Sequence, residues 1–190
     1  QFSSIRTVKL KLLLLLLKED LSSYSGDDYV PKISKLSIEK QIREGYPGKI
    51  VFANFLIDGI PLNNFKEIKD MDYVSCLGWG PKEFQQKQID RLLLKAKSDF
   101  ENNRNSIYIC PCSDLGCGAF SLKIKRSSKD DNTIIWYKLG YENNLDDWSS
   151  KLVNYYGIGP FYFDWEQYKE TIESSLLFGE PDYWHSDTWK

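Results

Sequence analysis

The chain has 190 residues, of which 42% are hydrophobic and 27% are charged, so its composition is that of a folded globular protein and excludes an intrinsically disordered one. The net charge of −2 excludes bulk electrostatic attraction to nucleic acid, which needs a basic surface to displace counterions. Aromatic residues make up 15% of the chain, which fits either an aromatic-rich core or a surface that binds another protein.

The first predicted element is a strand between Ile5 and Leu17, which contains the leucine run Leu12–Leu17. This run is much shorter than the roughly 20 apolar residues of a membrane-spanning helix, and it is also too short for the apolar part of a secretory signal. We therefore interpret it as a buried strand or a short buried helix. We expect a cytoplasmic protein with no membrane partner.

A polar segment over residues 22–48 follows, with one short helix predicted near Ile38 to Glu44. Residues 1–48 are expected to form a strand-and-loop extension that packs on the same body as the rest of the chain. The sequence has neither an internal repeat nor a low-complexity linker. Residues 49–190 are therefore expected to form a single α+β domain.

Strands dominate the first part of this domain. The segment from Lys49 to Ile57 is rich in β-branched and aromatic residues, which indicates a strand, and Asp58-Gly59 after it suits a tight turn. Three further strands are predicted at residues 106–109, 119–126 and 133–139, with a hairpin loop at 127–132 and a turn at 157–160.

Two helices are predicted. The first begins at Pro81, and its apolar residues recur at steps of three and four as far as Phe100. The second begins at Asp164, a good N-cap, with Gln167 three residues later as in a capping box. Its apolar side comprises Trp165, Tyr168, Ile172 and Leu176, and the tail at 179–190 is expected to fold back. Together the elements predict an α+β fold, a mainly antiparallel sheet with two main helices packed against it.

Three of the four cysteines, Cys110, Cys112 and Cys117, lie close together in the sequence. A tetrahedral zinc site needs a fourth ligand, which Cys76 or His185 could supply, but the chain has no second pair of closely spaced cysteines. We therefore favour a tight glycine-containing turn whose small cysteines fill the core, with free thiols and no cofactor. A zinc-stabilised binding module built on the three cysteines stays open as an alternative.

The sequence offers no complete catalytic set. His185 is the only histidine, so a histidine-dependent triad would rest on it alone. The glycine-rich stretch Gly78–Pro81 lacks the Lys-Ser/Thr of a phosphate-binding loop. Carboxylates are plentiful, so a carboxylate-based hydrolase of unknown substrate remains the alternative to a protein that is not an enzyme.

Acidic and amide residues cluster at 27–28, 130–132 and 142–147. Such clusters are typical of solvated loops, but they would also complement a basic protein partner. Exposed aromatic side chains next to them could anchor that partner. The residues predicted to bind it are Asp130, Asp131, Tyr141, Glu142, Asp146, Asp147 and Trp148.

A set of motifs resembles a widespread group of small bacterial proteins. The motifs are the Asp114-Leu-Gly-Cys-Gly118 turn, the strand around Trp136, the stretch from Tyr141 to Asn144, and Gly159-Pro-Phe-Tyr-Phe-Asp164 ahead of a helix. The resemblance covers roughly residues 49–176 and carries no catalytic residue with it.

The small size, the slightly acidic and aromatic-rich composition and the missing catalytic set then suggest a role as an immunity protein of a polymorphic toxin or contact-dependent growth inhibition system. Such a protein would bind and neutralise the C-terminal domain of its cognate toxin, a nuclease for example, without catalysis.

Overall fold

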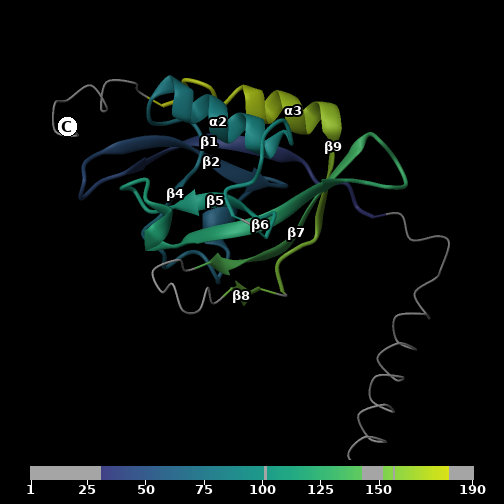
Figure 1. Cartoon of the computed structure of the whole chain (residues 1–190), viewed down its shortest axis with the longest axis horizontal. Helices are drawn as coiled ribbons and strands as arrows, with labels where there is room; N and C mark the ends of the chain where they lie inside the picture. The colour runs from purple at the N-terminus through teal and green to yellow at the C-terminus, as the bar shows by residue number, and fades with distance from the viewer. Residues whose placement is uncertain (1–30, 101, 143–151, 156, 180–190) are drawn as a thin grey trace, which may run out of the picture. The chain divides into compact units, whose positions relative to one another are not determined.

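The computed structural model describes residues 31–100, 102–142, 152–155 and 157–179 (Figure 1). Over these residues it has two α-helices and two antiparallel sheets, which confirms the predicted α+β fold. Residue contacts divide the chain into two compact units, and all the elements belong to the unit that begins at residue 33. The strand predicted at residues 5–17 and most of the predicted tail lie outside the described residues. Neither described helix has the length and hydrophobicity to cross a membrane.

The smaller sheet has the strand order β1-β2-β3. Strand β2 (Ile50–Ile57) is the predicted strand at 49–57, and almost all its side chains are buried. Asp58 and Gly59 follow with φ angles of 53° and 80°, which confirms the predicted tight turn into β3 (Ile60–Pro61).

Strand β1 (Leu36–Arg43) corrects one prediction, because residues 38–44 were expected to form a short helix. It pairs antiparallel with β2 over its whole length, and Leu36 at its start is fully buried. The segment is polar and carries only a weak local signal, so pairing with a buried strand decides its conformation. β1 therefore lies within the segment predicted to be the N-terminal extension, yet it is part of the same sheet as β2.

The larger sheet has six antiparallel strands in the order β4-β5-β6-β7-β8, with β9 also paired to β7. Its strands are β4 (Val74–Ser75), β5 (Asn105–Ile109), β6 (Ala119–Arg126), β7 (Thr133–Glu142), β8 (Val153–Asn154) and β9 (Phe161–Asp164). The three strands predicted here are confirmed as β5, β6 and β7. β7 is central because β6 occupies one of its edges while β9 and β8 share the other.

The two helices, α2 (Lys82–Leu92) and α3 (Trp165–Glu173), lie side by side on one side of the strands (Figure 1). Helix α2 starts after Pro81 as predicted but ends at Leu92, well before Phe100, and Leu94 has a φ of 59°. The N-cap at Asp164 is confirmed, since its carboxylate accepts a hydrogen bond from the backbone N–H of Gln167. The side chain of Gln167 does not complete a capping box; it bonds both backbone groups of Leu36 in β1.

The core is built around Trp136 of β7, which is fully buried. Its ring makes edge-to-face contacts with Phe55 of β2, Phe163 of β9 and Tyr168 of α3, at centroid distances of 5.4, 5.3 and 6.0 Å. These contacts join both sheets and the helix layer. Much of the aromatic excess in the sequence therefore serves the core.

Candidate functional site

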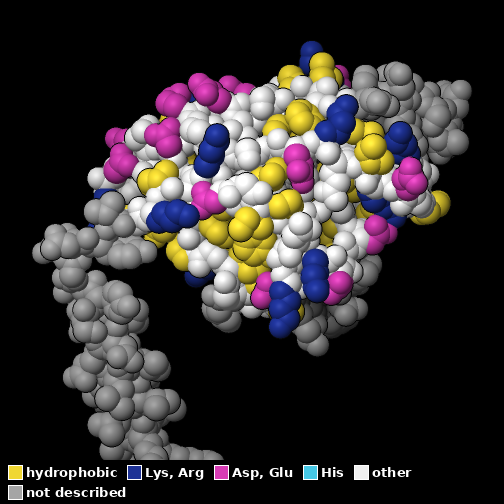
Figure 2. Space-filling model, turned by 180° about the vertical axis from the view of Figure 1, so that it is seen from behind, with side chains coloured by type: hydrophobic (Ala, Val, Ile, Leu, Met, Phe, Trp, Pro, Cys, Tyr) yellow, Lys and Arg dark blue, Asp and Glu magenta, His cyan; other side chains and the backbone are white. Residues whose placement is uncertain are grey.

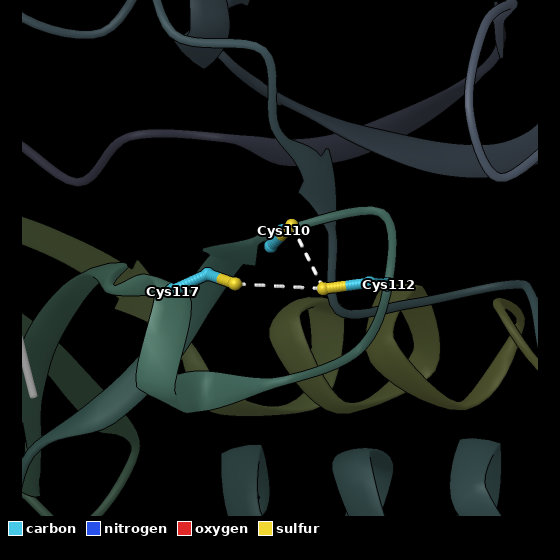
Figure 3. A group of neighbouring side chains, drawn as sticks. All are labelled: Cys110, Cys112 and Cys117. Carbon is cyan, nitrogen blue, oxygen red and sulfur yellow. Dashed lines mark hydrogen bonds between the residues drawn. The ribbon is translucent and has the colours of Figure 1, made fainter. Parts of the chain in front are cut away.

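The connection between β5 and β6 gathers three cysteines on one short turn (Figure 3). The Sγ atoms of Cys110, Cys112 and Cys117 all lie within 4.8 Å of one another. Cys112 is the middle member, with its Sγ 2.9 Å from that of Cys110 and 3.6 Å from that of Cys117. Of the described histidine, cysteine and acidic side chains, these three form the one group with ligand atoms close enough to share a metal ion.

Local hydrogen bonds bend the backbone so that the thiols converge. The backbone N–H of Ser113 donates to the carbonyl of Cys110 at 2.9 Å, and Ser113 has a φ of 62°. The carboxylate of Asp114 then accepts from the N–H of Gly116 at 2.8 Å and caps the 3₁₀ turn η2 (Leu115–Cys117). Such an Asx turn reverses the chain, which brings Cys117 back beside Cys112.

Two tyrosines hold the end of this turn: Tyr73, which immediately precedes β4, and Tyr141 of β7. The hydroxyls of Tyr73 and Tyr141 lie 3.1 and 3.4 Å from the carbonyl oxygen of Cys117 and 3.1 Å from each other. Gly118, the next residue, has a φ of 90°, and a Cβ atom there would lie 2.3 Å from the hydroxyl of Tyr141. Only glycine fits this position, because a side chain would meet both backbone strain and the tyrosine.

The three thiols differ in acidity because they hydrogen-bond one another. Hydrogen bonds with Cys112 and Cys110 raise the pKa of Cys117 to about 12, and burial adds to the effect. Burial, followed by the bond with Cys112, raises the pKa of Cys110. Burial also acts to raise the pKa of Cys112, but its hydrogen bonds with Cys110, the backbone of Asp114 and Cys117 together outweigh burial, and the net shift is downward. Of the three thiols, Cys112 therefore loses its proton most readily, and its two neighbours stabilise the thiolate that forms.

The structure corrects the expected role of these cysteines. The predicted turn is present, but the three thiols are half-buried and face one another rather than filling the core. Cys76 is the core cysteine: it is fully buried, and burial raises its pKa to about 12. It does not belong to the thiol group, so it is not the fourth ligand considered above. His185, the other candidate, lies outside the described residues.

Of the four described residues that were predicted to bind a partner, Tyr141 and Glu142 do not lie on an exposed acidic surface. Glu142 is only 3% exposed, and its carboxylate pairs with Arg104 and accepts hydrogen bonds from Asn102 and Ser121. Tyr141 is half-buried and stacked on Tyr73. Both residues therefore stabilise the fold, a role that the sequence does not reveal because their partners are distant along the chain.

Asp130 and Asp131 are exposed, in the loop between β6 and β7. Asp130 shapes that loop by accepting hydrogen bonds from the backbone of Asn132 and the hydroxyl of Thr133. The remaining three predicted residues, Asp146, Asp147 and Trp148, lie outside the described residues. On the face shown in Figure 2, side chains of both charges lie interspersed with hydrophobic ones.

The chain matches no protein-family model, no curated protein and no solved structure. The resemblance noted from the sequence motifs therefore stays a prediction.

Proposed function

We propose that this protein binds a soft metal ion through Cys110, Cys112 and Cys117. The observation that carries the proposal is the convergence of three Sγ atoms within 4.8 Å on one turn. Thiolates are soft donors, and they select ions such as Zn²⁺ and Cu⁺ over hard cations. With metal–sulfur bonds of about 2.3 Å, ligand sulfurs lie about 3.8–4.0 Å apart, so the observed cluster needs only small side-chain rotations to close on an ion.

The acidity of the cluster supports the same proposal. Metal binding requires deprotonated thiols, and Cys112 already has a lowered pKa. A cation at the centre of the three sulfurs would favour loss of the other two protons by direct charge attraction. The hydroxyls of Tyr73 and Tyr141 hold the backbone of the third ligand, as outer-shell groups commonly do at metal sites.

The test is metal analysis of the full-length chain, purified under reducing conditions without chelator and then titrated with Zn²⁺ and with Cu⁺ separately. We expect one tightly bound ion per chain. The Cys112→Ser variant should lose at least about 10-fold in affinity, since it removes the middle ligand. Cys76→Ala is the matched control, because it removes a thiol outside the cluster. Wild-type protein that binds neither ion would refute the proposal.

A second candidate function, neutralisation of a bacterial toxin domain, is supported by the exposed carboxylates of Asp130 and Asp131. These project from a hairpin loop whose backbone is fixed by hydrogen bonds, so the charge is presented without a large ordering cost. A basic partner such as a nuclease domain would be complementary to them. The buried Glu142 and the stacked Tyr141 are not part of this surface.

Co-purification tests this second candidate. The tagged chain would be expressed with the product of the gene immediately upstream, and a stoichiometric complex that rescues growth would support it. The double variant Asp130→Lys, Asp131→Lys should then slow association and make it less dependent on salt. Unchanged binding by that variant would remove the loop from the interface.

A further inference from the structure

The cysteine turn is ordered by the protein's own contacts. Its backbone is fixed by the Ser113–Cys110 and Gly116–Asp114 hydrogen bonds, and the Cys117 carbonyl accepts from Tyr73 and Tyr141. The principal core lies elsewhere, around Trp136. A metal ion would therefore not be needed to tie separate parts of the fold together, as it is in small structural zinc domains.

The position of the ligands in the sequence also argues against a structural role for the metal ion. All three lie within the eight residues from Cys110 to Cys117, so an unfolded chain can wrap them around an ion almost as readily as the folded one. A ligand stabilises a protein only to the extent that it prefers the native state. Metal binding here should therefore change stability little, unlike a site whose ligands come from distant segments.

Within the part of the chain that the structure describes, the donor set has three members rather than four. Among the described residues, no other histidine, cysteine or acidic side chain joins the group. The nearest acidic side chain in sequence, Asp114, is engaged with the backbone of Gly116. Structural zinc sites are closed by four protein ligands, whereas monovalent copper is satisfied by fewer, softer donors.

The cluster is also open to other molecules. All three cysteines are only half-buried, and Ser113 and Asp114 in the same turn are exposed. An incoming thiolate can therefore approach a bound ion from solvent. Such an approach is what ligand exchange requires, because the new bond must form before a protein thiolate leaves.

We propose that the cysteine turn is a three-sulfur site for Cu⁺, which is held as exchangeable cargo rather than as a structural cross-link. The inference rests on the proposed function, since it presumes that the three thiols bind a soft ion. In each exchange step, a thiolate of the acceptor forms a new Cu–S bond, a protein Cu–S bond breaks, and the released thiolate takes a proton from water. Steps of this kind repeat until no protein Cu–S bond remains and the ion has passed to the acceptor. Copper stays monovalent throughout, so no oxidant or reductant is consumed.

The experiment compares Cu⁺ and Zn²⁺ on the full-length chain under nitrogen, with a non-thiol reductant present. Competition against a chromophoric chelator of each ion gives the two affinities, and X-ray absorption gives the number of sulfur neighbours. We expect Cu⁺ bound one per chain with three sulfur neighbours, a preference for Cu⁺ of at least about 100-fold over Zn²⁺, and full transfer of copper to excess glutathione within minutes. Cys112→Ser should reduce the Cu⁺ affinity at least about 10-fold, and Cys76→Ala should not.

The thermal midpoint separates cargo from cross-link. We expect loading with Cu⁺ to raise the Tm by less than about 3 °C. A Zn²⁺ complex with four protein ligands, resistance to glutathione, or a rise in Tm of more than about 10 °C would overturn this inference and leave the proposed metal-binding function standing. Failure to bind either ion would instead refute the proposed function itself.

Discussion

Glu142 gives the sharpest test of how this fold is held together, because the sequence places it in a partner surface and the structure buries it. Its carboxylate lies 3.4 Å from the Nε of Arg104 and accepts hydrogen bonds from Asn102 at 2.6 Å and Ser121 at 3.0 Å. Both members of the ion pair have side chains less than 5% exposed. The Glu142→Ala substitution would leave the guanidinium of Arg104 buried without its counter-charge.

The expected loss follows from that burial. Burial lowers the pKa of Arg104, and the charge and hydrogen bonding of Glu142 oppose this effect. The buried guanidinium therefore depends on Glu142 to offset the free-energy cost of carrying its charge. Breaking a buried pair by removing one partner costs about 3–5 kcal/mol. With a urea dependence of about 2 kcal/mol per M, the unfolding midpoint should fall by about 1.5–2.5 M. Glu142→Gln keeps the shape and part of the hydrogen bonding, so it should lose less, about 1–3 kcal/mol.

Asp131→Ala is the matched control, because the side chain is exposed and should change the free energy of unfolding by less than about 0.5 kcal/mol. Urea unfolding followed by tryptophan fluorescence measures all three variants. If the free energy of unfolding of Glu142→Ala lies within about 1 kcal/mol of the wild-type value, the buried ion pair does not stabilise β7.

Backbone strain, a buried hydroxyl, a surface ion pair and thiol exposure can each be tested with point variants or chemical labelling. Gly118→Ala should cost at least about 2 kcal/mol, because its Cβ would meet the Tyr141 hydroxyl at a φ of 90°. Gly157→Ala should be near neutral in the same urea assay, because no atom of the described residues lies within 4 Å of its Cβ position. Tyr168→Phe should cost about 1–3 kcal/mol, since the Tyr168 hydroxyl accepts a hydrogen bond from the Trp136 indole and donates one to the Leu92 carbonyl. Tyr46 is 87% exposed, so Tyr46→Phe should change the free energy of unfolding little. The pKa of Asp72 is lowered by its hydrogen bond with Arg43, so the pair stabilises the protein above the ordinary aspartate pKa and loses this contribution as the pH falls through the lowered pKa. The difference in free energy of unfolding from Asp72→Asn should be under about 1 kcal/mol, because Asp72 is 72% exposed, and should vanish once the pH lies below that lowered pKa. Iodoacetamide should label the half-buried turn cysteines of the native protein, Cys112 first because its pKa is lowered, and spare Cys76, which is fully buried and out of reach of the reagent. Mass spectrometry showing equally fast labelling of Cys76 would contradict this.

Local signals predicted much of the fold because the residues concerned act through their neighbours in sequence. Asp58-Gly59 fixes the β2–β3 turn by its own φ angles, and Asp164 caps α3 through the N–H of a residue three positions on. The polar strand β1 was missed because its conformation depends on pairing with β2. The end of α2 was placed too late because the apolar spacing continues past Leu92, although the backbone turns at Leu94.

Surface assignments failed where a charged or aromatic residue has a partner far along the chain. In the sequence, Glu142 looks like part of an acidic run. Nothing near it in the sequence shows that its charge is neutralised by Arg104, the residue immediately before β5. Tyr141 looks like an exposed anchor, yet it stacks on Tyr73, 68 positions away. Long-range pairing of this kind is decided by topology, which local pattern does not encode.

The cysteine turn lies between these two cases. Spacing alone argued against a metal site, because closely spaced cysteine pairs are the usual sign and only one such pair is present. The chain supplies the third ligand by reversing direction, through the Asx turn at Asp114 and the glycine required at position 118. The sequence does contain a local signal for this reversal. Asp114 lies two residues before Gly116, a pattern typical of an Asx turn, and such a turn can bring Cys117 back beside Cys112. The spacing rule describes sites that are closed by two separate segments. Here a single turn gathers three thiols, so the site that we propose would be local, open to solvent and weakly coupled to folding.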